Sequence, residues 1–227
     1  MIPGGDSRRR HDSGPAARPI TVVGVSAGKL PSEKMIQWWP PLGVIAMLTL
    51  GFSVGKGSTP FDAWFFDLTQ AVFGVQPRWL LFFTDWEFLV PVLVVCVGFE
   101  LYRRRWRVAA VVLICPFIAN WTTQATKMLV GREKGGYLAY PSGHTTVVVA
   151  VMGMLVLVAG GALWAYIVAG IVSTLGLLGQ VACGYHYLTD TVGAVLVTTA
   201  VVVLAIWAAG QSSSSAASTS SDKSTLV

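Results

Sequence analysis

The feature that most constrains the fold of this chain is a series of apolar stretches, each close to the length that crosses a lipid bilayer. The hydrocarbon core of a bilayer is roughly 30 Å thick, and a helix needs about 20 residues to span it. Of the 227 residues, 54% are hydrophobic and 12% are charged, which is about half the usual share of charge. Six spans are predicted, at residues 38–55, 85–102, 108–129, 144–159, 163–182 and 189–209. The fold class that follows is an all-α, polytopic membrane protein with six transmembrane helices.

The two ends of the chain differ in composition from its middle. Residues 1–37 are basic and rich in Pro, Gly and Ser, and residues 211–227 form a Ser-rich, low-complexity stretch. Both are too polar to bury a core, so we expect two disordered tails around one membrane domain, residues 38–210. The first apolar run begins near Trp38, too late for a secretory signal peptide.

Lys and Arg are concentrated in two of the segments that link or precede the spans. They are Arg8, Arg9, Arg10, Arg18, Lys29 and Lys34 in the N-terminal tail, and Arg103, Arg104, Arg105 and Arg107 after the second span. Such enrichment marks the cytoplasmic side of a cell inner (plasma) membrane, so six spans place both termini there. The net charge of +5 is thus a topology signal rather than a sign of nucleic-acid binding. The expected partner is the lipid bilayer, and the sequence leaves homo-oligomer formation open.

A further helix is predicted in the loop after the first span. Thr59 can cap a helix, Pro60 suits its first position, and Asp62 lies near its positive end. Apolar residues follow at helical spacing, which favours a helix lying along the outer leaflet. Packing over the bundle and admission of lipid both remain open as its role.

Two of the three histidines flank the fourth and fifth spans. His144 begins one apolar run and His186 follows another, and the segment between them fits two spans of about 18 residues joined by a turn at 159–163. Two spans return both histidines to the same, extracytoplasmic face. We therefore expect the two side chains to be neighbours.

The segment before His144 is typical of an anion site. Pro141 and Ser142 suit a helix start, and Gly143 lets a ligand approach the backbone. The free N–H groups of a helix start, together with the helix dipole, attract phosphate. The sequence therefore predicts phosphate binding at the start of the fourth span.

Charged residues near both histidines extend this site. Lys127 ends the third span, and Arg132 and Lys134 follow in the loop. Asp190 lies four residues after His186. A carboxylate at that spacing can hold one imidazole nitrogen and leave the other free to attack.

Together these residues resemble the type 2 phosphatidic acid phosphatase superfamily, a family of six-span lipid phosphatases with the signatures K-x6-R-P, P-S-G-H and S-R-x5-H-x3-D. The second signature is intact at residues 141–144, and the third keeps His186 and Asp190. The resemblance covers roughly residues 40–209. It implies a six-helix membrane phosphatase with its active site at the extracytoplasmic face.

The chain departs from the family pattern at two cations. Lys134 stands where the first signature has Arg, with Arg132 two residues earlier, and Gln180 stands where the third signature has Arg. Lysine offers a point charge where arginine offers a fork, and glutamine donates without charge. The phosphate pocket is thus less positive than the family pattern, and Arg132 is the residue we expect to compensate.

The resemblance also implies a mechanism. His186 attacks phosphorus, Asp190 orients it, and His144 protonates the leaving oxygen and later helps to activate water. The implied phosphate-binding residues are Lys127, Arg132, Lys134, Ser142, Gly143 and Gln180. No metal and no other cofactor is implied.

The expected substrate is a membrane lipid phosphate or diphosphate, with a polyprenyl phosphate or diphosphate carrier as the first hypothesis because an outward site suits carrier recycling in a cell envelope. A phosphatidylglycerol-phosphate or phosphatidic acid phosphatase, and a phosphatase of a polyprenyl-linked sugar phosphate, are alternatives. A catalytically weak lipid-phosphate binding protein on the same fold is a further alternative, which Gln180 favours.

Overall fold

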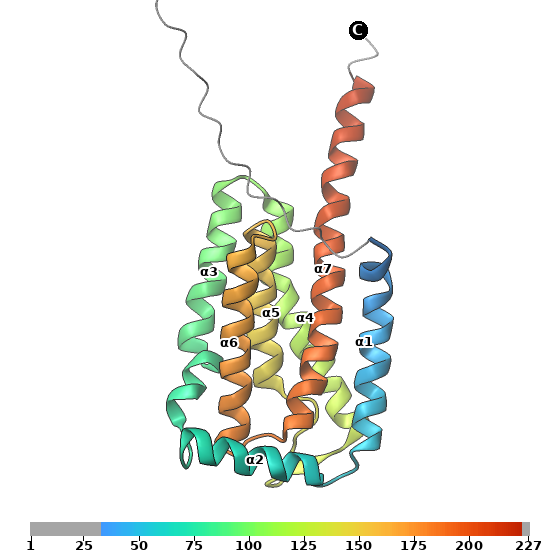
Figure 1. The fold of residues 1–227 in the computed structure, drawn as a ribbon. Coiled ribbons are helices and arrows are strands. Elements are labelled where there is room, and N and C mark those ends of the chain that lie inside the picture. Colours follow the sequence, from blue (N-terminus) through green and yellow to red (C-terminus); the bar gives the residue numbers. More distant parts are fainter. Residues whose placement is uncertain (1–32, 224–227) are drawn as a thin grey trace, which may run out of the picture.

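The computed structural model describes residues 33–223, which form a bundle of α-helices with one 3-10 helix and a short hairpin (Figure 1). The helices are α1 (Glu33–Ser53), α2 (Pro60–Phe73), α3 (Trp86–Tyr102), α4 (Trp106–Val130), α5 (Gly143–Val158), α6 (Leu163–Ala182) and α7 (Leu188–Lys223). The 3-10 helix η1 (Arg78–Thr84) precedes α3, and strands β1 (Glu133–Lys134) and β2 (Tyr137–Leu138) lie between α4 and α5. The all-α prediction is confirmed.

The six long helices coincide with the six predicted spans, but they do not all satisfy the same criterion. Within the described residues, four segments are long and apolar enough to cross a membrane: Arg78–Tyr102, Trp106–Val130, Leu163–Ala182 and Leu188–Gly210. Helix α5 is apolar but has only 16 residues. Helix α1 begins with charged and polar residues and contains Pro40 and Pro41, so its apolar part is short. Length and composition therefore support four of the six predicted spans.

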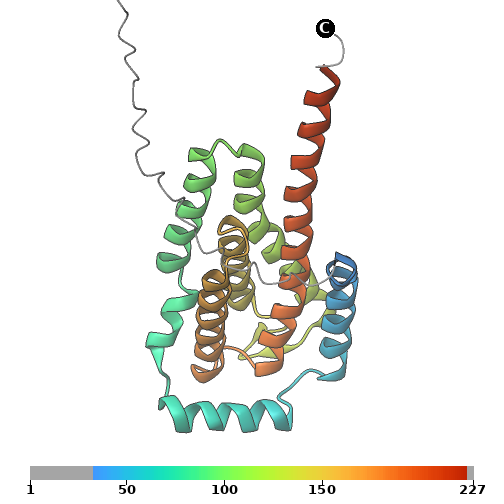
Figure 2. The same cartoon turned by 45° about the horizontal axis from the view of Figure 1, so that its top comes forward.

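Helix α5 lies at the centre of the bundle, in contact with α3, α4, α6 and α7 (Figure 2). Its side chains are apolar on almost every face, as expected for a helix that other helices surround. Close approach of α7 depends on Gly153, where an added Cβ would lie 2.8 Å from the Val202 side chain. Helix α5 starts beside Asn120 and Gln124, about two turns before α4 ends at Val130. Its N-terminus therefore opens inside the bundle rather than at its rim.

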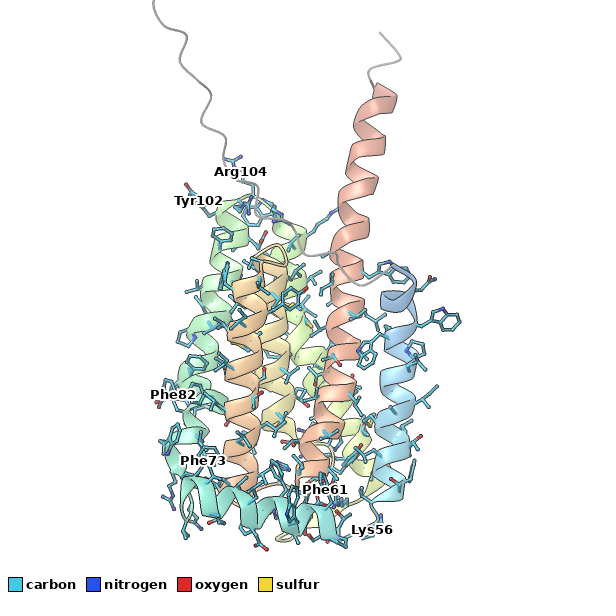
Figure 3. All side chains as sticks on the ribbon, in the orientation of Figure 1. Lys56, Phe61, Phe73, Phe82, Tyr102 and Arg104 are labelled. Atoms are coloured by element: carbon cyan, nitrogen blue, oxygen red, sulfur yellow. The ribbon has the colours of Figure 1, made fainter. Side chains whose placement is uncertain are left out.

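Helix α2 runs across one end of the bundle (Figure 1). Thr59 is its N-cap, as the sequence predicts, and it forms a reciprocal capping box with Asp62. Phe61 and Trp64 are exposed on this helix. Figure 3 shows Phe61 at the α2 end of the molecule and Arg104 at the opposite end.

The outer boundaries differ from the predicted domain limits. Helix α7 continues past residue 210 to Lys223, in a stretch that contains no proline to stop it. Helix α1 begins at Glu33, inside the predicted tail 1–37. Residues 1–32 and 224–227 lie outside the described residues, and with them most of the predicted basic tail.

Candidate active site

The start of α5 is fixed by hydrogen bonds on both sides. Ser142 is its N-cap, and the hydroxyl oxygen accepts the Thr145 N–H at 3.3 Å. The Ser142 N–H donates to the main-chain oxygen of Asp190 at 3.0 Å, which ties α5 to α7. The hydroxyls of Thr146 and Thr123 bond at 2.8 Å and tie α5 to α4. These bonds hold the P-S-G-H segment rigidly between α4 and α7. The segment begins a helix, as the sequence predicts.

The two histidines are neighbours, as the sequence predicts. His144 lies in the first turn of α5 and His186 in the link between α6 and α7. Their ring centroids are 6.3 Å apart and the ring planes meet at 61°. The His186 N–H donates to the Gln180 carbonyl oxygen at 3.2 Å, which anchors the link to the end of α6. Both histidines line the same cavity.

Asp190 lies on the Nδ1 side of the His186 ring. Its Oδ2 is 3.6 Å from His186 Nδ1 and accepts the Tyr187 N–H at 2.9 Å. The separation from Nδ1 is within ion-pair range but beyond a hydrogen bond. The carboxylate is fully buried. This arrangement leaves Nε2 as the nitrogen of His186 that is free to react.

Arg132 is completely buried, and every N–H of its guanidinium has a protein acceptor. Nη1 donates to Thr189 Oγ1 at 2.6 Å and to Asp190 Oδ1 at 2.8 Å. Nη2 donates to the Gly57 oxygen at 2.7 Å and to Asp62 Oδ2 at 2.8 Å, and Nε donates to the Gly57 oxygen at 3.2 Å. An arginine has five N–H donors, and all are used here. Arg132, expected from the sequence to bind phosphate, therefore has no N–H donor left for a ligand here, and it does not line the cavity.

Asp62 connects α2 to this buried network. Its carboxylate accepts the N–H of Thr189 at 2.9 Å and the Thr189 hydroxyl at 2.9 Å, besides its ion pair with Arg132. Burial raises the pKa of Asp62, but hydrogen bonds from Thr189, Arg132 and Thr59 outweigh it and hold the pKa below its ordinary value. A chain of contacts thus runs from α2 through Arg132 to Asp190 and on to His186.

Lys134 is carried over the site by a tight hairpin. Gly135 and Gly136, between β1 and β2, have φ of 58° and 82°, the left-handed values that two-residue hairpin turns require. Lys134 Nζ donates to the His186 oxygen at 3.1 Å and lies 4.3 Å from the Tyr187 ring centroid. Burial lowers the pKa of Lys134, while Asp190 and Asp62 act in the opposite direction. Lys134 remains in contact with the cavity.

The cavity has a volume of about 900 Å³ and two chemically different ends. Its polar wall includes Lys127, Lys134, Gly143, His144 and His186. Its apolar wall includes Leu89, Val90, Leu93, Pro116, Phe117, Val147 and Val151 from α3, α4 and α5. A phosphate group fits the first end and a hydrocarbon chain fits the second.

Two other residues expected to bind phosphate lie outside this lining. The Ser142 side chain is buried, and its oxygen is occupied as the helix cap. Gln180 is buried against η1, where its Nε2 donates to Thr84 Oγ1 at 2.9 Å. Of the six residues expected to bind phosphate, three line the cavity: Lys127, Lys134 and Gly143. The other three lie outside the lining: Ser142, Gln180 and Arg132.

Several cavity residues were not singled out from the sequence as site residues. They are Thr84, Asp85, Asn120, Gln124 and Tyr185. The signal for two of them was present, because Asn120, Gln124 and Lys127 recur at helical spacing in a mostly apolar span. Among residues 33–223, no cluster of three or more His, Cys, Asp or Glu side chains has the arrangement of a metal site.

A family model and a solved structure are similar to this chain. The family model of the PAP2 superfamily matches residues 111–213. No curated protein matches the chain. Among solved structures, the chain is similar to the crystal structure of the first transmembrane PAP2-type phosphatidylglycerolphosphate phosphatase from Bacillus subtilis, with a TM-score of 0.59 and 17% identity over 74% of this chain and 94% of that one. This likeness concerns the fold. The stretch that matches the PAP2 superfamily model, residues 111–213, includes His144, His186 and Asp190.

Proposed function

We propose that this protein is a membrane lipid phosphatase that works through a phosphohistidine intermediate. The observation that carries the proposal is the pair His144 and His186, which line the polar end of a cavity whose other end is apolar. A molecule with one phosphate and one hydrocarbon part matches both ends. The match of residues 111–213 to the PAP2 superfamily model supports the same reaction class.

The reaction begins with His186. Its Nε2 attacks phosphorus, the bond from phosphorus to the lipid oxygen breaks, and His144 gives that oxygen a proton. Water then attacks the phosphohistidine, His144 takes a proton from it, and phosphate leaves with His186 restored. Asp190 stabilises the positive form of the His186 ring from the Nδ1 side, where its oxygen lies 3.6 Å away.

Phosphate recognition falls to groups that reach the cavity. Lys127 and Lys134 supply positive charge, and Gly143 supplies a main-chain N–H at the positive end of α5. Charge develops on the phosphoryl oxygens during transfer, and donors already in place stabilise it. Arg132 contributes indirectly, because it fixes Asp190.

Membrane orientation follows from the ends of the bundle. The arginine-rich link around Arg104 lies at the end opposite α2 (Figure 3). Helix α2 lies at the histidine end, because Asp62 of α2 accepts the N–H of Thr189, three residues after His186. Arg-rich links favour the cytoplasmic side, so we infer that the active site opens on the extracytoplasmic side with both termini cytoplasmic. A cysteine at Leu138, in a variant lacking Cys183, would then react with an impermeant thiol reagent in intact cells.

Two substrate classes match a cavity of this kind: polyprenyl phosphates or diphosphates, and glycerophospholipid phosphates. The fold likeness to a phosphatidylglycerolphosphate phosphatase supports the second class. A second candidate function, a lipid-phosphate binding protein with little turnover, is favoured by one observation. Among the described residues that line the cavity, the cations are lysines and none is arginine.

The test is phosphate release by the purified protein in detergent, over a panel of lipid phosphates and diphosphates, with excess EDTA present. Turnover should persist in EDTA, because histidine attack needs no metal, and His186→Ala should reduce it to the blank rate. Acid quenching should trap acid-labile phosphate on the wild type and none on His186→Ala. Loss of turnover in EDTA that magnesium restores would refute the mechanism, and a wild type no faster than His186→Ala would favour the binding protein.

A further inference from the structure

A polar pair on α4 lines the cavity and has no part in the phosphate chemistry. Asn120 and Gln124 lie one turn apart on the same face of the helix as Lys127. Around them α4 is apolar enough to cross a membrane. Polar side chains inside a membrane helix are costly and mark functional positions when they face a cavity. The pair therefore calls for a ligand group of its own.

The pair lies beside the start of α5. A Cβ added at Gly143 would be 3.5 Å from Gln124 Nε2 and 3.8 Å from Asn120 Oδ1. His144 is the next residue, so the two amides lie close to the proposed general acid. Lys127 lies further along α4, nearer its end at Val130. The amides thus lie between the phosphate-binding lysine and the apolar wall at Pro116 and Phe117.

Most of the hydrogen-bonding capacity of this pair is unused. Gln124 Nε2 donates to Asn120 Oδ1 at 3.4 Å, and within the part of the chain that the structure describes neither side chain has another partner. Two amides together hold four N–H donors. Covering free donors with hydrocarbon would be unfavourable, because each would lose water without gaining an acceptor.

The geometry of phosphoryl transfer brings the lipid to these amides. The leaving oxygen lies opposite the attacking nitrogen of His186 and close to His144, which protonates it. The part of the lipid bonded to that oxygen therefore passes Asn120 and Gln124 before it reaches the apolar wall. In a glycerophospholipid this part carries ester carbonyls, which accept hydrogen bonds. In a polyprenyl phosphate it is hydrocarbon.

We infer that Asn120 and Gln124 form a subsite for the ester groups of a glycerophospholipid phosphate. This inference rests on the proposed phosphatase function and names its substrate class. It reverses the first hypothesis drawn from the sequence, a polyprenyl carrier. The amide N–H groups donate to the ester carbonyls while the acyl chains lie along Phe117 and its apolar neighbours.

The experiment compares two substrates that differ only in these carbonyls. They are dioleoyl phosphatidic acid and its diether analogue, with farnesyl phosphate as a third substrate. The readout is the ratio of kcat/KM for diester over diether. The wild type should prefer the diester by about tenfold, as two neutral hydrogen bonds would allow. Asn120→Leu and Gln124→Leu should each lower the ratio, and the double variant should bring it near one.

The matched control is Thr122→Val. Thr122 lies on the same helix, its hydroxyl donates to the Ile118 oxygen at 2.9 Å, and it does not line the cavity. This variant should keep the wild-type ratio. A wild-type ratio near one, or a preference for farnesyl phosphate over the diester, would overturn the inference. Phosphate release by the wild type would still uphold the proposed function. This result is measured on the wild type, so it does not depend on whether any variant folds.

A binding measurement separates failure of the function from failure of the inference. Non-hydrolysable phosphonate analogues of the diester and diether lipids are titrated into the purified protein. If no lipid is hydrolysed, but the diester phosphonate binds more tightly and the double variant loses that preference, the phosphatase proposal fails and the ester subsite stands. Equal binding of both phosphonates by the wild type would overturn the subsite.

Discussion

Arg132 and Lys134 lie two residues apart in the same loop, and their surroundings give them different roles. Arg132 has no exposed surface and bridges the carboxylates of Asp62 and Asp190. Lys134 is half-buried, contacts the cavity and bonds to one main-chain oxygen, that of His186. An ammonium has three donors, so two N–H groups of Lys134 remain for a ligand. Arginine is the better phosphate ligand by its side-chain chemistry, yet here the arginine is the cation whose donors are all used within the protein.

The difference has a physical reason in the charges around each cation. A buried arginine is stable only if its charge and its donors are matched, and here two carboxylates, a hydroxyl and a carbonyl match them. Through these bonds Arg132 links α2 to α7. A phosphate-binding cation must instead keep unfilled donors at the cavity, which describes Lys134 and Lys127.

The largest expected effect is that of Arg132→Ala on stability. Removing the guanidinium leaves Asp62 and Asp190 buried and without their partner, which should cost about 3–5 kcal/mol of unfolding free energy. Thermal unfolding in one detergent measures it, with the exposed Arg78→Ala as the control. Turnover should fall together with stability. Normal stability with lost turnover would mean that Arg132 binds phosphate after all.

Next in size is the effect of Lys134→Ala on turnover. Losing a donor and a charge at the transferring phosphoryl group should reduce kcat/KM by about a hundredfold, as for removal of a donor to developing charge. The unfolding midpoint should change little, and Lys134→Arg should recover much of the rate because it restores the charge. Initial rates on the best lipid of the panel decide this. A shift in unfolding midpoint as large as that of Arg132→Ala would erase the distinction between the two cations.

The smallest expected effect is that of Asp62→Asn on stability at acidic pH. Because its folded-state pKa is held below the ordinary value near 3.9, its ionised form stabilises the protein above that pH, and the contribution is lost as pH falls through the folded pKa. Asp62→Asn should be modestly less stable at neutral pH. It should also lose less stability than the wild type between pH 5 and pH 3.

Unfolding midpoints over this pH range, measured on both proteins in the same detergent, give the comparison. Asp67→Asn, an exposed position on the same helix, is the matched control and should follow the wild type. Parallel pH profiles for wild type and Asp62→Asn would show that the Asp62 carboxylate does not stabilise the network in its ionised form.

Local patterns were enough to predict the helices and part of the site. The capping residues of α2 and α5 act through hydrogen bonds to neighbours in sequence, so Thr59 and Ser142 were recognisable as helix starts. The length between His144 and His186 predicts two helices joined by a turn, and two antiparallel helices bring both ends to one face. Asp190 follows from its spacing after His186 along the chain.

Tertiary structure alone decided which polar groups reach the ligand. Whether Arg132 is buried depends on Gly57, Asp62 and Thr189, which come from distant parts of the chain. The same holds for Gln180, which turns to Thr84 of η1 and away from the cavity. Asn120 and Gln124 are recognised as site residues only because the start of α5 packs beside them. Spacing along a chain sets which residues share a helix face, but burial and the filling of donors are set by the neighbours that packing supplies.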